Sequence, residues 1–153
     1  MNNFISELIY GGMDGVITTI AIIGAALGAQ LEKKYIAIIG ASSLLADGIS
    51  MGVSRYNSLV NKKGCNICSG LYTFFFFVLF GMIPLIPFFM NQERELMIKS
   101  FLFLSFVSFV TIGILKGQVK NNIMRSVITT LLLGGGASYL SYYVAKTMKY
   151  RLV

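Results

Sequence analysis

One short stretch of the chain places an acid, a thioether and a cation in an otherwise apolar segment. Asp47, Met51 and Arg55 follow one another at intervals of four residues, so in a helix they lie on one face. Serines at neighbouring helical positions widen this face into a polar stripe. An ionisable residue at membrane depth is costly and usually faces a bundle interior or a water-filled path. This face is therefore the first candidate for a functional site.

A second acid, Asp14, lies in the first apolar run, and Asp14 and Asp47 are the only acids well inside the predicted spans. A carboxylate with a thioether suits a transition metal such as ferrous iron or manganese, whereas calcium and magnesium prefer oxygen ligands throughout. A site with few ligands binds a metal ion weakly, and weak binding is needed if the ion is to leave the site and cross the membrane. Alternatively, the acids pair or cap within the bundle, and Met51 fills a packing gap.

Cys65 and Cys68 form a single CxxC pair in a short polar loop. A closed zinc site needs four ligands, and the chain has no other Cys and no His. Two subunits meeting on a two-fold axis could pool their pairs into a four-cysteine metal site. A single CxxC is a weak signal, however, and a pair of inert reduced thiols is the favoured interpretation.

The composition is that of a membrane protein. The 153 residues are 56% hydrophobic and only 12% charged, which is too apolar for an ordinary soluble domain. The net charge of +7 comes from Lys and Arg at the ends of apolar runs, where they anchor helices, and not from a nucleic-acid-binding patch. With no His, no phosphate-binding glycine loop and no activated nucleophile, the sequence predicts neither an enzyme nor a permanently bound cofactor.

Five apolar runs are long enough to cross a bilayer, at about 20 residues per crossing. They predict an all-α bundle that forms one membrane domain over residues 1–153, with helices at about 9–29, 35–59, 71–90, 96–115 and 127–145. The third helix, rich in Phe and carrying both prolines, is expected to face lipid and to be kinked. The first run contains an acid and lacks a basic leader, so it is expected to remain a transmembrane helix.

Small residues recur at four-residue spacing in the first predicted helix, as Gly11 with Gly15 and as Gly24 with Gly28. Such faces let another backbone approach closely. In one interpretation they form the seam of a two-fold homodimer, in which the acids and thioethers of both subunits surround a shared path. In the other interpretation they pack the first helix against the second within one subunit.

Three motifs of the chain resemble the vacuolar iron transporter family. They are Tyr10-Gly-Gly-Met-Asp-Gly-Val-Ile-Thr-Thr19, Leu45-Ala-Asp-Gly-Ile-Ser-Met-Gly52 and Gly113-Ile-Leu-Lys-Gly117, the last before a Gly-rich final helix. The resemblance implies a dimeric five-helix membrane protein with a cytosolic N-terminus, which moves ferrous iron or manganese out of the cytosol in exchange for protons. It also implies that Asp14 and Met51 are metal ligands of the path. We add Asp47 as a supporting acid.

Two features depart from the family pattern. Vacuolar members carry a helical, Glu-rich metal-binding domain between the second and third helices, where this chain has the Cys65–Cys68 loop. The family often has an acid where this chain has Arg55, and a cation near the cytosolic mouth would repel an incoming divalent ion. A second hypothesis is therefore a membrane scaffold or metal-binding regulator that keeps the transporter fold without flux.

Overall fold

The structure, a computed structural model, describes residues 3–59 and 65–152, and within these ranges the chain forms five α-helices. They are α1 (Asn3–Gly28), α2 (Lys33–Ser58), α3 (Asn66–Phe89), α4 (Arg94–Lys120) and α5 (Ile123–Leu152). All five are long and apolar enough to cross a membrane. This confirms the predicted all-α, five-helix bundle of a multi-pass membrane protein.

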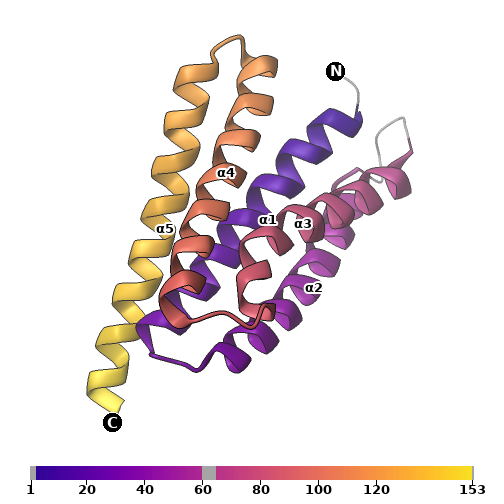
Figure 1. Ribbon diagram of the computed structural model, residues 1–153. Coiled ribbons are helices and arrows are strands. Elements are labelled where there is room, and N and C mark those ends of the chain that lie inside the picture. Colours follow the sequence, from indigo (N-terminus) through magenta and orange to yellow (C-terminus); the bar gives the residue numbers. More distant parts are fainter. Residues whose placement is uncertain (1–2, 60–64, 153) are drawn as a thin grey trace.

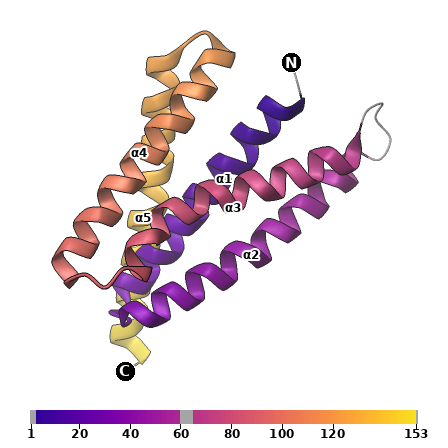
Figure 2. The same cartoon turned by 45° about the vertical axis from the view of Figure 1, so that its right-hand side comes forward.

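α1 is the centre of the bundle (Figure 1). It contacts all four other helices, and its contacts with α3 and α5 are the most extensive. α2 and α3 pack together as one pair, and α4 and α5 form a second pair (Figures 1 and 2). The start of α1, the end of α2 and the turn between α4 and α5 all lie at the same end of the bundle (Figure 1).

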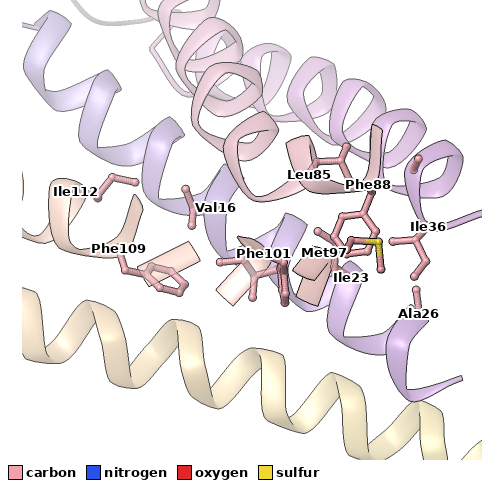
Figure 3. Close-up of a cluster of buried hydrophobic side chains, with 12 residues drawn as sticks. Val16, Ile23, Ala26, Ile36, Leu85, Phe88, Met97, Phe101, Phe109 and Ile112 are labelled. Atoms are coloured by element: carbon pink, nitrogen blue, oxygen red, sulfur yellow. The ribbon is translucent and has the colours of Figure 1, made fainter. Parts of the chain in front are cut away.

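Apolar side chains from α1 to α4 form the buried core (Figure 3). Its buried members are Val16, Ile20, Ile23, Ala26, Ile36, Ala37, Leu85, Phe88, Met97, Phe101, Phe109 and Ile112. The rings of Phe88 and Phe101 meet edge to face, with their centroids 5.8 Å apart. Because lipid is as apolar as these side chains, dense packing rather than exclusion from water holds such a core together.

The expectation that the third helix faces lipid holds for only one side of α3, where Leu71, Phe75 and Leu79 are exposed. α3 contacts α1 and α2 extensively and α4 to a lesser extent, and its Thr73, Phe77 and Leu85 are almost completely buried. Hydropathy could not distinguish the two positions, since a helix in the middle of a membrane bundle is as apolar as one that faces lipid.

The glycines of α1 pack this helix against α3 and α5 inside the subunit. A Cβ atom at Gly11 would lie 2.5 Å from a backbone carbonyl oxygen of α3, and one at Gly15 would collide with the next turn of α3. Gly24 and Gly28 approach the backbone of α5 in the same way. The interpretation that these glycines pack within one subunit is therefore confirmed, but their partners are α3 and α5 instead of α2, and they do not form an exposed dimer seam.

The helices extend beyond the apolar runs that predicted them. α1 begins at Asn3 instead of about residue 9, α3 begins at Asn66, and α5 continues to Leu152. Helical hydrogen bonding continues through polar residues at the membrane surface, so an apolar run underestimates the length of a helix. The added turns at the start of α1 bring Glu7 into the bundle.

Candidate functional site

The two acids singled out in the sequence lie near the middle of their helices, Asp14 in α1 and Asp47 in α2. Both are exposed on the surface of the single subunit, and they are close enough for their charges to interact. Met51 is half-buried one helical turn after Asp47. The structure thus brings the two acids together across α1 and α2, with the thioether one turn away.

A polar stripe continues from Asp47 along α2. Ser50 and Ser54 are exposed, and Ser43 is half-buried. An ionised side chain facing hydrocarbon at a helix centre costs about 2.5–3.5 kcal/mol on insertion scales. A surface of this kind in a membrane therefore faces either a water-filled path or another protein surface.

Asp14 also lines a cavity of about 350 Å³ between α1 and α4. Tyr10 and Met13 line it from α1, and Lys116 and Lys120 line it from α4. The Nζ atom of Lys116 lies 3.6 Å from the Sδ atom of Met13. The cavity therefore offers a cation one carboxylate and a second thioether, Met13, which the sequence analysis did not consider, and it places a lysine beside them.

One subunit brings few metal ligands together. Over residues 3–59 and 65–152, no group of three or more His, Cys, Asp or Glu side chains comes close enough to hold a metal ion. The α1–α2 face supplies two carboxylates and one thioether. A complete coordination sphere there needs water or a second protein surface.

A buried ion pair between Glu7 and Arg55 lies at the end of the bundle where α1 begins. The Glu7 side chain is 1% exposed and that of Arg55 is 27% exposed. Arg55 Nε donates to both Glu7 oxygens at 2.9 and 2.8 Å, and Arg55 Nη2 donates to Oε1 at 2.6 Å. Thr73 Oγ1 lies 2.9 Å from Glu7 Oε2. These contacts join α1, α2 and α3.

Glu7 is not among the site residues predicted from the sequence, because the first helix was predicted to begin at about residue 9. A signal was present, since Glu7, Gly11 and Gly15 recur at four-residue spacing and share the face that packs on α3. The pair also corrects the expected repulsion by Arg55, because its positive charge is neutralised by Glu7 within the subunit.

Cys65 and Cys68 form a disulfide at the start of α3, with their Cα atoms 5.3 Å apart. Cys65 is the N-cap of α3, and its Sγ accepts a hydrogen bond from Cys68 N at 3.3 Å. This corrects both interpretations of the CxxC pair. The sulfurs are not reduced thiols, and a disulfide has no thiolate with which to bind a metal.

A family model matches the chain along most of its length, and named relatives match a shorter part of it. A family model described as "VIT family" matches residues 5–66 and 60–146. A protein named vacuolar iron transporter from Toxoplasma gondii is 36% identical over 62 residues, which is 40% of this chain and 20% of that protein. One of the same name from Plasmodium falciparum is 41% identical over 59 residues, which is 39% of this chain and 22% of that protein. The aligned segments thus cover about a fifth of these relatives.

Proposed function

Since the chain belongs to the VIT family, we propose that it is a transporter that exports ferrous iron or manganese from the cytosol in exchange for protons. Its N-terminus is then cytosolic. One observation carries the proposal: Asp14 and Asp47 lie exposed near the middle of two membrane-spanning helices, within electrostatic reach of each other. The name of the relatives, vacuolar iron transporter, favours iron as the substrate.

In this function Asp14 and Met51 bind the metal, and Asp47 supports them with a second negative charge. A carboxylate and a thioether together favour a transition metal over calcium or magnesium. Protons compete with the metal for the same carboxylate oxygens, because a carboxylate in a low-dielectric bundle favours its neutral form. This competition is the physical basis for exchanging one cation for the other.

A homodimer completes the site in this proposal. A two-fold axis along the membrane normal would place two Asp14 and two Met51 side chains around one path, which makes four ligands from a chain that supplies two. The polar stripe on α2 supports this arrangement, since its exposed Asp47 and Ser50 would be costly against lipid. The α1 glycines contribute nothing to the seam, because they are used inside the subunit.

The buried Glu7–Arg55 pair favours a second candidate, a scaffold or metal-binding regulator without flux. The pair joins α1 to α2, and Thr73 adds α3. An ion pair in a low-dielectric site resists separation, because breaking it leaves two unpaired charges away from water. A protein that needs these helices to move apart during a transport cycle would have to overcome that cost.

Metal uptake by reconstituted vesicles distinguishes the two candidates. We expect the parent to transport Fe²⁺. The flux of the Asp14→Asn variant should be lower by a factor of about ten or more, because a neutral amide binds a divalent cation more weakly than a carboxylate does. Glu95→Gln is the matched control, since Glu95 is an exposed acid that pairs with Lys99 at 2.6 Å on the surface of α4. It should transport like the parent.

Two outcomes would contradict the proposal. If Asp14→Asn transports as fast as the parent, Asp14 is not a ligand of the path. If the folded parent gives no flux of Fe²⁺ or Mn²⁺ under any gradient, the scaffold is the better assignment.

A further inference from the structure

A basic cavity of about 500 Å³ lies where α4 ends and α5 begins. It is lined by Lys116, Lys120, Asn122, Arg125, Ser126 and Thr129. The lining contains three cations and three neutral polar side chains but no acid. The α4–α5 turn lies at one end of two helices that are long and apolar enough to cross a membrane (Figure 1), so in a bilayer the cavity would lie near the lipid headgroups.

The three cations of this cavity have no carboxylate partner in the described part of the chain. The ion pairs found there involve Glu7, Glu32 and Glu95, none of which lines the cavity. Lys116 makes a weak contact with the thioether sulfur of Met13. Three like charges around one hollow repel one another, and a bound anion would relieve this repulsion.

The neutral side chains of the cavity add hydrogen-bond donors. Ser126 is 5% exposed, and its hydroxyl makes no hydrogen bond within residues 3–59 and 65–152. The hydroxyl of Thr129, in contrast, donates a hydrogen bond to the carbonyl oxygen of Arg125 at 2.7 Å. Asn122 Oδ1 accepts from Arg125 N at 3.2 Å, which leaves the amide NH₂ of Asn122 free to donate. The donors thus outnumber the acceptors around the hollow.

We infer that this cavity binds a phosphate group, carried either by a lipid headgroup or by free phosphate. Phosphate offers only acceptor oxygens in its ionised form, and it is bound by Arg in a forked geometry, by Lys as a point charge and by the N-terminus of a helix. Lys116, Lys120 and Arg125 line the cavity, next to the start of α5. The site shares Lys116 and Lys120 with the neighbouring cavity that contains Asp14, but phosphate binding can be measured without transport.

Occupancy of this site has a consequence for the neighbouring cavity. Lys116 and Lys120 line both the basic cavity and the cavity that contains Asp14. A phosphate group beside Lys116 would neutralise part of the positive charge near Asp14 and so lower the local repulsion of cations.

Native mass spectrometry of the delipidated full chain tests the inference. We expect a phosphatidic acid, which carries a phosphate monoester, to bind at least about tenfold more tightly than zwitterionic phosphatidylcholine. The double variant Lys120→Gln/Arg125→Gln should lose this preference. Lys146→Gln/Arg151→Gln is the matched control, because it removes the same charge from the opposite end of α5, and its affinity should stay within about twofold of the parent.

A conservative variant covers the case in which the double variant does not fold. Ser126→Ala removes one neutral donor without a change of charge, and Ala is a good helix former. We expect it to weaken phosphatidic acid binding by about tenfold or more, the effect of one hydrogen bond to a charged group. Competition by millimolar inorganic phosphate would identify free phosphate as a ligand, and binding that inorganic phosphate does not displace would identify the lipid headgroup.

Two results would overturn the inference. One is equal binding of phosphatidic acid and phosphatidylcholine by the folded parent, with no binding of inorganic phosphate. The other is an equal loss of affinity in the cavity variant and in the control at the far end of α5, which would mean that net charge alone attracts the lipid.

Discussion

The carboxylate of Glu7 and the guanidinium of Arg55, 48 residues apart in the chain, form an ion pair that is buried between helices. Both carboxylate oxygens accept from Arg55, and one of them also lies within hydrogen-bond distance of Thr73. A buried ion pair does not always stabilise a protein more than apolar side chains of similar size at the same place. Each charge does, however, offset the cost of removing the other charge from water. Its contribution is best measured by removing the partners singly and together.

Arg55→Gln should lower the free energy of unfolding by about 3–5 kcal/mol, because it leaves the buried charge of Glu7 without its partner. Glu7→Gln should cost less, because the Arg55 side chain is 27% exposed and keeps contact with water. The double variant should lose clearly less than the sum of the two single losses. Glu95→Gln, which breaks an exposed pair on α4, should cost no more than about 1 kcal/mol. The measurement is SDS titration in mixed micelles. Additive single losses would mean that the two side chains do not interact.

Gly15→Ala should destabilise the bundle by about 2 kcal/mol or more, since the new Cβ would collide with the backbone of α3 and overpacking costs about 1–3 kcal/mol. Gly136→Ala is the matched control on α5, because nothing lies within 4 Å of a Cβ there. It should be neutral or slightly stabilising by helix propensity. Thermal unfolding in detergent compares the two, and equal midpoints would contradict the close contact between α1 and α3.

The purified chain should show no reactive thiol before reduction and two after it, because its two cysteines form a disulfide. Alkylation followed by mass spectrometry counts the thiols. The variant Cys65→Ser/Cys68→Ser should transport Fe²⁺ as the parent does, since the disulfide lies outside the proposed metal path. Two reactive thiols without reductant, or a loss of flux in the variant, would restore a role in metal binding.

A cysteine placed on the polar stripe of α2 should report the proposed dimer. In the background Cys65→Ser/Cys68→Ser, the variant Ser50→Cys should form a cross-linked dimer on mild oxidation, because Ser50 lies on the face that a second subunit is proposed to cover. Phe103→Cys is the control, as Phe103 is 66% exposed on α4. Electrophoresis without reductant detects the product. Equal cross-linking at both positions would contradict a specific seam on α2.

A proton gradient should drive the proposed exchange. In vesicles whose interior is acidic, the parent should accumulate Fe²⁺ from a neutral medium, and a protonophore should stop the uptake, because protons and metal compete for the carboxylates of Asp14 and Asp47. Fluorescence of an enclosed metal indicator follows the accumulation. If the rate of uptake is the same with and without the gradient, proton exchange is contradicted and facilitated diffusion explains the uptake.

The number of helices, their order and the two candidate acids could be predicted from the sequence. Each is a local property: an apolar run of sufficient length must form a helix in lipid, since it has to satisfy its own backbone hydrogen bonds. An acid in such a run stands out for the same reason, because few residue types are tolerated there. Asp14 and Asp47 are therefore recognisable as candidates from the residue types around them.

Tertiary structure alone decided which surfaces meet. The Gly11 and Gly15 face packs on α3 and the Gly24 and Gly28 face on α5, although all four glycines look alike in sequence. The pairing of Arg55 with Glu7 also depends on the tertiary fold, since it joins residues from two helices and Glu7 lies before the first predicted apolar run. In a membrane the solvent and the protein interior are equally apolar, so composition does not tell an inner face from an outer one, and only packing does.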